Sequence, residues 1–261
     1  MLAAILWDVD GTLAETERDG HLAAFNAAFE AAGVAWRWSE RRYAELLQVA
    51  GGRERLLHDM QSQSDAPSGA RAQAALAERL HGLKNEAYAA IMAAGGFPLR
   101  EGVEDLLADC RRAQLCLGIV TTTGRSNVAS LLGSRLGADW DSWFDCVVCA
   151  EDAPRKKPDP QAYRIALERL DLPPRIALAI EDSPNGVDAA IGARVPVLRV
   201  RSHFFALGER RGEIAVGPSL ASRSGWEPTP EPSVLRRINL AQLRRWHADS
   251  VGAAFDSDAG R

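Results

Sequence analysis

Two aspartates separated by a single residue follow a short apolar run near the start of the chain, in the stretch Ile5-Leu6-Trp7-Asp8-Val9-Asp10-Gly11-Thr12. The apolar run predicts a buried strand of a parallel sheet, and Gly11 predicts the turn that ends it. In open α/β sheets the ligand crevice lies outside the carboxyl ends of the strands, so we expect Asp8 and Asp10 at that edge. Two carboxylates there could hold a hard cation such as Mg²⁺. The simpler alternative is a pair of solvated acids at a strand end.

Three later sites add polar residues of complementary chemistry. Thr121 follows the apolar run 115–120, and Glu181-Asp182 follows the run 176–180. Lys157 lies immediately before Pro158, just ahead of a helical stretch. Together with Asp8, these groups provide a carboxylate nucleophile, a hydroxyl donor, a cation and an acidic pair that could bind a metal. Phosphoryl transfer needs this set, because its catalysis is mostly positioning and electrostatic stabilisation.

The order of the elements predicts an α/β fold with a doubly wound parallel sheet. After the first strand, helical patterns alternate with apolar runs at 115–120, 144–150, 176–180 and 195–200. Residues 16–96 show helical periodicity with almost no strand signal, which predicts an all-helical insertion. We therefore expect a catalytic core from residues 1–15 and 97–261 and a helical cap from residues 16–96. Towards the C-terminus we expect a strand near 213–216, a surface loop and a helix that starts near Leu240.

The composition narrows the classes of partner. The 261 residues are 46% hydrophobic and 25% charged, with a formal net charge of −4, which leaves no broad basic field for nucleic acid or an anionic membrane. The run Leu2–Trp7 is too short for a signal peptide or a membrane span, so we expect a cytoplasmic protein. Cys146 and Cys149 have the spacing of half a zinc or redox site. On a strand they would face opposite ways, so we expect buried thiols.

The four polar sites, in their order and strand context, resemble the four motifs of the haloacid dehalogenase-like (HAD) phosphohydrolases. The helical insertion is similar to the C1 cap of the β-phosphoglucomutase-like subgroup. Three further stretches resemble the CbbY branch: Gly51-Gly52-Arg53-Glu54-Arg55, Thr121-Thr122-Thr123 and Lys156-Lys157-Pro158. Members of that branch are phosphatases of sugar phosphates, including xylulose-1,5-bisphosphate. The resemblance therefore implies a phosphatase of a small phosphorylated sugar, acting as a monomer.

The resemblance also implies a role for each core residue. Asp8 would attack the phosphorus and form an aspartyl-phosphate, while Asp10 would be the general acid and then the general base. Mg²⁺ would be bound by the Asp8 side chain, the Asp10 backbone carbonyl and Asp182, with Glu181 holding a metal-bound water. Lys157 would balance the charge of the phosphate, and Thr121 would donate a hydrogen bond to it.

Substrate selection is expected from residues around this core, namely Glu17, His21, Gly51, Gly52, Arg53, Thr122, Arg125 and Asn185. Arg53 and Arg125 could grip a second phosphate bidentately. Taken singly, either arginine could equally be a solvated surface residue, His21 a helix-surface histidine and Asn185 a turn residue. A β-phosphoglucomutase-type mutase, which shares every core motif, stays open as the alternative activity.

Overall fold

A parallel six-stranded sheet forms the centre of the computed structural model, which describes the backbone of residues 1–258 and the side chains of residues 1–252. The strand order is β3-β2-β1-β4-β5-β6, with bounds Cys146–Val148, Cys116–Val120, Ala4–Trp7, Ala177–Glu181, Val197–Val200 and Ala215–Gly217. The central strand β1 pairs with β2 and β4, and Trp7 is level with Ile119 and Ile180. This register brings the residues that follow the three strands to one edge of the sheet and confirms the predicted doubly wound fold.

Two apolar layers cover the sheet, so its central strands are buried on both faces. On β1, Ile5 and Trp7 belong to one hydrophobic cluster, whereas Ala4 and Leu6 belong to the other. The first cluster includes residues of α5 (Val103–Arg112), α6 (Arg125–Leu136) and α9 (Leu240–Asp258). The second includes residues of α7 (Gln161–Leu170) and α8 (Pro184–Gly192). Alternate side chains of each strand thus bind helices on opposite faces.

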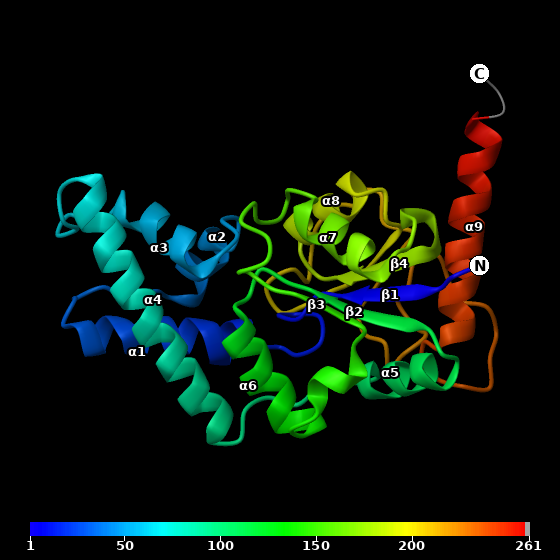
Figure 1. Ribbon diagram of the computed structural model, residues 1–261, viewed down its shortest axis with the longest axis horizontal. Helices are drawn as coiled ribbons and strands as arrows, with labels where there is room; N and C mark the ends of the chain where they lie inside the picture. The colour runs from blue at the N-terminus through cyan, green and yellow to red at the C-terminus, as the bar shows by residue number, and fades with distance from the viewer. Residues whose placement is uncertain (259–261) are drawn as a thin grey trace.

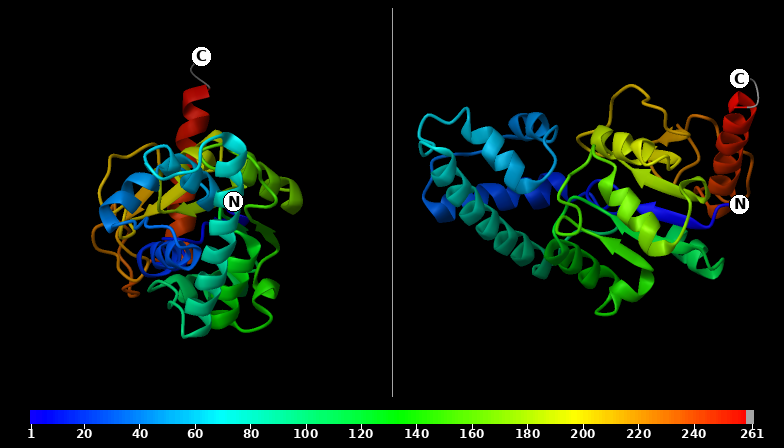
Figure 2. Two further views of the ribbon diagram at one scale, coloured as in Figure 1. Left: turned by 90° about the vertical axis from the view of Figure 1, so that its left-hand side faces the viewer. Right: turned by 45° about the horizontal axis from the view of Figure 1, so that its top comes forward.

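The helices between β1 and α5 form a group with an apolar core of its own, which we call the helical unit. Its elements are η1 (Glu17–Leu22), α1 (Ala23–Ala32), α2 (Glu40–Leu46), α3 (Gly52–Met60) and α4 (Ala70–Ala93). Phe25, Phe29 and Trp38 pack at its centre. Figure 1 shows the helical unit at one end of the molecule and α9 at the other, with the sheet between them; the right-hand view of Figure 2 keeps this arrangement, and the left-hand view looks along it from the helical unit.

Several boundaries differ from the sequence-based expectations. The helix expected from Thr16 begins with a π-helical turn, in which the His21 N–H donates to the Thr16 carbonyl across five residues. The strand β3 is shorter than the apolar run 144–150. Cys146 and Cys149 are buried, free and assigned to opposite clusters, in agreement with strand geometry.

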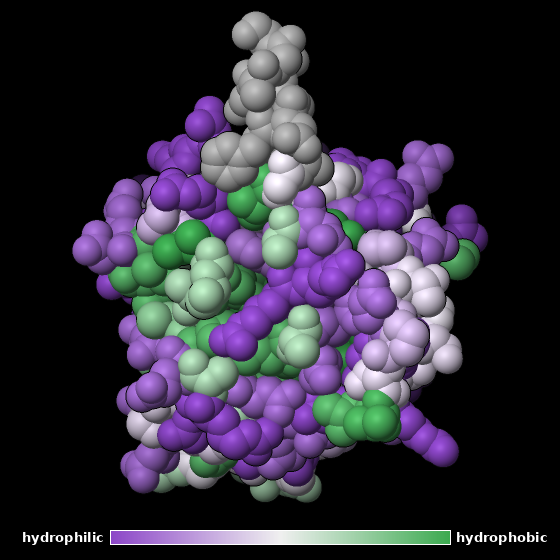
Figure 3. Space-filling view, turned by 90° about the vertical axis from the view of Figure 1, so that its right-hand side faces the viewer, coloured by the Kyte–Doolittle hydropathy of each residue, from purple (hydrophilic) through white to green (hydrophobic). Residues whose placement is uncertain are grey.

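The C-terminal part of the chain closes the far end of the sheet. Between β5 and α9 the chain is irregular except for β6, and the short 3₁₀ turns η2 (Trp140–Trp143) and η3 (Pro174–Ile176) lie in earlier connections. Trp246 of α9 packs on Trp226 with ring centroids 5.1 Å apart. The face at this end is mostly hydrophilic, interrupted by apolar areas (Figure 3). No described helix has both the length and the apolar character that a membrane crossing requires.

Candidate active site

A buried lysine joins the end of β1 to the end of β4. Lys157 Nζ lies 2.8 Å from Asp8 Oδ1 and 2.6 Å from Glu181 Oε1, and it also donates to the Val120 carbonyl at 2.8 Å. All three side chains are buried. The ammonium group therefore bridges the carboxyl ends of three adjacent strands, which places Asp8 beside a fixed positive charge.

Three carboxylates meet at this edge of the sheet. Asp8, Glu181 and Asp182 are buried, and each offers an oxygen within 4.8 Å of the other two. Burial raises the pKa of Asp8 to about 8, against the opposing effect of Lys157, and burial together with Asp8 raises the pKa of Asp182. One lysine cannot neutralise three close carboxylates, so the site favours a further cation.

The surroundings of these carboxylates fit a hard divalent metal. Among the described residues Glu181 Oε2 has no hydrogen-bond partner although it is buried, and Asp182 accepts from Ser202 Oγ at 2.6 Å. A β carbon at Gly11 would collide with the Asp182 carboxylate, and one at Gly186 would collide with Glu181. The glycines thus let the backbone approach an all-oxygen donor set of the kind that Mg²⁺ prefers.

Asp10 is held apart from this cluster by hydrogen-bond donors of its own. Thr16 Oγ1 donates at 2.5 Å, His21 Nε2 lies at 2.9 Å, and Thr123 Oγ1 also donates to the carboxylate. Burial opposes ionisation, but His21 and the hydrogen bonds lower the pKa of Asp10 well below its ordinary value. The His21 ring is stacked on Tyr88 with centroids 4.4 Å apart. His21 is therefore a buried partner of Asp10 rather than a surface histidine.

Two segments present hydrogen-bond donors to the space above Asp8. Thr121 is buried, and its Oγ1 accepts from the Thr123 N–H at 3.1 Å, which leaves the hydroxyl proton free to donate. The helix α8 begins beyond Ser183, whose side chain accepts from the Gly186 N–H. A phosphoryl group could therefore accept from the Thr121 hydroxyl, and the N-terminus of α8 suits it because helix N-termini carry unpaired N–H groups and a partial positive charge.

A cavity of about 290 Å³ lies between the strand ends and the helical unit. The core contributes the catalytic candidates, including Asp8, Asp10, Thr121 and Lys157. Of the expected substrate contacts, seven line the cavity, namely Glu17, His21, Gly51, Gly52, Arg53, Thr122 and Asn185. The structure thus brings residues from two distant parts of the chain around one space of the size of a small phosphorylated molecule.

The two arginines expected to bind a second phosphate are placed differently. Arg53 lines the cavity, and its Nε lies 3.2 Å from Glu78 at the surface. Arg125 begins α6 but turns away from the cavity, because its guanidinium donates to Asp152 at 2.7 Å and to the Val147 carbonyl. The structure therefore does not bring Arg125 to the site, whereas it keeps Arg53 there.

Lys84 is a cavity-lining residue that the sequence analysis missed. Its side chain is only 4% exposed and lies over the rings of Phe25 and Tyr88, at 5.6 Å and 5.0 Å from the centroids. Burial lowers its pKa to about 8. A signal was present, since Leu80, Lys84 and Tyr88 follow a four-residue spacing along the buried face of α4. A lysine on such an apolar stripe indicates a functional cation.

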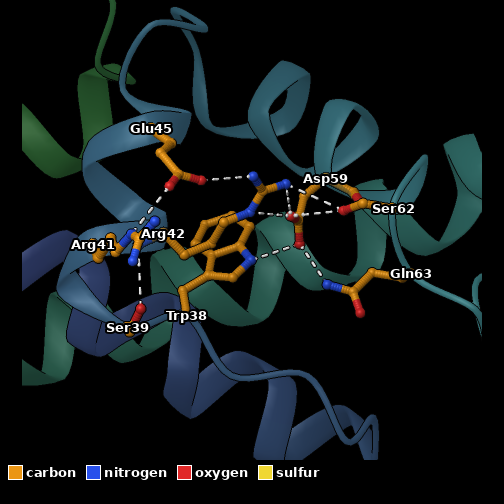
Figure 4. A network of polar contacts seen from close by, with 8 residues as sticks. All are labelled: Trp38, Ser39, Arg41, Arg42, Glu45, Asp59, Ser62 and Gln63. Carbon is orange, nitrogen blue, oxygen red and sulfur yellow. Dashed lines mark hydrogen bonds and ion pairs between the residues drawn. The ribbon is translucent and has the colours of Figure 1, made fainter.

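A buried polar cluster positions the cavity loop of the helical unit. Asp59 of α3 accepts hydrogen bonds from four side chains around α2 and α3, shown in Figure 4: Trp38 at 2.6 Å, Arg42 at 2.6 and 2.9 Å, Gln63 at 2.9 Å and Ser62 at 3.5 Å. Despite burial, the first three of these donors lower the pKa of Asp59. They fix α2 against α3, and the connection between the two ends at Gly51, where φ is 94°. The cluster thereby sets where Gly52 and Arg53 enter the cavity.

The family model of haloacid dehalogenase-like hydrolases matches residues 2–194. The chain belongs to this family. The plasmid CbbY protein of Cupriavidus necator is 41% identical over 250 residues, which cover 94% of this chain and 97% of that protein. The resemblance drawn from the four motifs is confirmed.

Solved structures of CbbY agree with the fold of this haloacid dehalogenase-like hydrolase. CbbY from Rhodobacter sphaeroides in complex with phosphate is 36% identical, and the match covers 94% of this chain and all of that chain with a TM-score of 0.82. A variant of the same protein in complex with xylulose-(1,5)bisphosphate gives a TM-score of 0.81 over 93% of this chain and 99% of that chain. The family match and the CbbY relatives together show that this chain is a phosphatase.

Proposed function

We propose that this phosphatase is Mg²⁺-dependent, hydrolyses sugar phosphates through an aspartyl-phosphate on Asp8, and takes a sugar bisphosphate such as xylulose-1,5-bisphosphate. The observation that carries the proposal is the pairing of Asp8 with Lys157 on the floor of a polar cavity, with Asp10 held separately. Residues 16–96 act as the cap that closes over the substrate, and the enzyme acts as a monomer.

The metal would be held by the Asp8 and Asp182 side chains and the Asp10 backbone carbonyl, with Glu181 beside it. When bound, Mg²⁺ supplies positive charge that offsets the repulsion between the Asp8 carboxylate and the phosphate. The three clustered carboxylates and the unpartnered oxygen of Glu181 support this assignment.

In the first step an Asp8 carboxylate oxygen attacks the phosphorus, and the bond from phosphorus to the sugar oxygen breaks. Lys157 favours the ionised form of Asp8 against the effect of burial and faces the developing charge, while Thr121 donates to a phosphoryl oxygen. A proton passes from Asp10 to the departing sugar oxygen. Asp10 accepts several hydrogen bonds here, which favours its ionised form, so carrying that proton requires loosening of the contacts from Thr16, His21 or Thr123.

In the second step the hydrogen-bonded state of Asp10 is the productive one. The ionised carboxylate takes a proton from water, the water oxygen attacks the phosphorus, and the bond from Asp8 to phosphorus breaks. Free phosphate leaves, and Asp8 regains its carboxylate. The lowered pKa of Asp10 keeps its carboxylate ionised, so that it is free to accept this proton.

Recognition of the sugar would come from the helical side of the cavity. Glu17 accepts a hydrogen bond from Tyr43 at 2.5 Å, which leaves its other carboxylate oxygen for sugar hydroxyls. Lys84 and Arg53 supply the cations that a second phosphate requires, and Thr122, Gly51, Gly52 and Asn185 shape the remaining wall. These two cations of the helical unit support a bisphosphate over a monophosphate.

The test is a screen of mono- and bisphosphorylated sugars for released phosphate, with and without Mg²⁺. We expect release that requires the metal and is fastest with a ketopentose bisphosphate. Conversion of glucose-1-phosphate to glucose-6-phosphate without release would instead establish a mutase. A flat profile across sugars would contradict the proposed substrate class.

A further inference from the structure

The segment Ser202–Phe205, which follows β5, touches the metal-site carboxylates at one end and the helical unit at the other. Ser202 Oγ donates to Asp182 Oδ2 at 2.6 Å, and three residues later Phe205 lines the cavity. We call these four residues the clasp. None of them was a candidate from the sequence, since they lie in an irregular loop of the core.

The clasp contacts the helical unit through His203 and Phe204. The His203 backbone N–H donates to Glu15 Oε2 at 3.3 Å, and its ring nitrogen lies 3.4 Å from Glu40 at the start of α2. The Phe204 ring meets the Tyr43 ring edge-on at 5.6 Å. Phe204 and Phe205 both pack against the apolar cluster of the helical unit, although they belong to the core part of the chain.

Tyr43 contacts both Phe204 and Glu17, and so links the clasp to the substrate side of the cavity. It is fully buried, and its hydroxyl donates to Glu17 Oε2 at 2.5 Å while accepting from Arg55 at 3.0 Å. The ring of Tyr43 therefore has Phe204 as a neighbour, and its hydroxyl fixes the rotamer of Glu17. Phe204 packs on Tyr43 together with Phe25 and Trp38, and it is the one of the three that comes from the core part of the chain.

The clasp adds to two other contacts between the core and the helical unit. On one side α4 contacts α6, where Asn127 donates to Asn85 at 3.0 Å. Near α8 the Asn185 side chain donates to the Gln48 carbonyl at 3.1 Å. The clasp adds an aromatic contact and an aromatic wall residue to these polar bridges, and aromatic pairs contribute about 0.5–1.5 kcal/mol beyond their buried area.

We propose that the clasp determines specificity: Phe205 forms the wall against which the sugar lies, and Phe204 is a positioning residue that holds Glu17 through Tyr43. This inference rests on the proposed function, because it concerns the same cavity. Substrates that fill the helical side should depend on the clasp. A small aryl phosphate, which needs only the phosphoryl site around Asp8, should not.

The experiment compares kcat/KM for a ketopentose bisphosphate and for p-nitrophenyl phosphate in four variants: Phe204→Ala, Phe205→Ala, Tyr43→Phe and the control Leu207→Ala. Leu207 lies in the same loop and is 91% exposed. We expect the first three to lose about tenfold on the bisphosphate, mostly through KM, while p-nitrophenyl phosphate changes by less than about twofold. Phe204→Tyr should restore the wild-type ratio, and the Leu207→Ala variant should match wild type.

Equal losses on both substrates, or no loss on either, would overturn the clasp as a specificity element. Combining Tyr43→Phe with Phe204→Ala should cost little more than either change alone, because both act on Glu17; full additivity would contradict that route. Thermal unfolding of each variant checks that the fold is kept. If the wild-type enzyme hydrolyses p-nitrophenyl phosphate but no sugar phosphate, the proposed function itself is wrong, and this inference fails with it.

Discussion

The Lys157 ammonium lies 2.8 Å from the Asp8 carboxylate, which joins residues 149 positions apart in the chain. Lys157 also contacts Glu181 at 2.6 Å, so one cation serves both the candidate nucleophile and a candidate metal-site acid. The pKa of Lys157 is raised above its ordinary value, because the two carboxylates outweigh the effect of burial. The lysine therefore stays charged at any pH at which the enzyme works, and the charge of the site is set by its acids.

Replacing Lys157 by methionine is expected to lower kcat/KM by at least about a hundredfold and to destabilise the fold by about 3 kcal/mol. The loss of stability should grow as pH rises above the ordinary carboxylate range, since unpaired buried acids have raised pKa values and resist ionisation. Steady-state kinetics and denaturant unfolding at two pH values measure both effects. Lys156→Met is the matched control, because Lys156 lines the same cavity but its Nζ donates to the Ala150 and Ala153 carbonyls and not to the acids. A Lys157 variant that matched this control would contradict the role.

Replacing Asp10 by asparagine should reduce turnover of sugar phosphates by about 10²–10⁴-fold without unfolding the protein. Asparagine keeps the volume, but its one amide oxygen can accept from Thr16 or from Thr123 and not from both, since the two donate to different Asp10 oxygens, and it cannot carry a proton between the sugar oxygen and water. Asp8→Asn is expected to abolish turnover altogether, because no nucleophile remains. Activity assays with circular dichroism separate catalysis from folding. Retained turnover in either purified variant would contradict the mechanism.

The KM for a sugar bisphosphate is expected to rise as pH increases above about 8, because burial lowers the pKa of Lys84 to about 8 and its cation is lost there. The same shift makes a prediction for stability. The folded-state pKa lies below the ordinary lysine value, so the free energy of unfolding gains a contribution as pH rises from about 8 towards about 10.4. Lys84→Met should remove both pH dependences, and a KM that climbed identically in this variant would contradict the assignment.

Arg53 and Arg125 are the two arginines expected to bind a second phosphate, so their alanine variants form a matched comparison. Arg53→Ala should raise the KM for a bisphosphate by about tenfold and leave monophosphates nearly unchanged, because Arg53 lines the cavity. Arg125→Ala should stay within about twofold of wild type on both, since its guanidinium is bound to Asp152 outside the cavity. If Arg125→Ala raised the KM for a bisphosphate and Arg53→Ala did not, the second phosphate would lie towards α6.

The sequence was informative where chemistry coincides with strand ends. Asp8, Thr121 and the pair Glu181-Asp182 follow apolar runs, and a parallel sheet brings such positions to one edge whatever the helices do. The register of β1 with β2 and β4 then sets them side by side. Lys157 does not follow a strand, and it was identified as the cation of the site through the resemblance to a family motif.

Residues on helices and loops were harder to predict, because their placement depends on packing between distant segments. Lys84 faces the cavity only because α4 packs against α1. Arg125 was expected to grip a second phosphate at the site, but its long side chain reaches Asp152 instead. Phe204 and Phe205 gave no periodic signal at all, since they lie in an irregular loop that meets the helical unit across the fold.

Rapid acid quench of the wild-type enzyme with a radiolabelled sugar bisphosphate and Mg²⁺ tests the central claim most directly. We expect label bound to the peptide that contains Asp8 within the first turnover, decaying at the rate at which phosphate appears, and no label in Asp8→Asn. Continuous release of phosphate with no covalent label on Asp8 at any quench time would contradict the account.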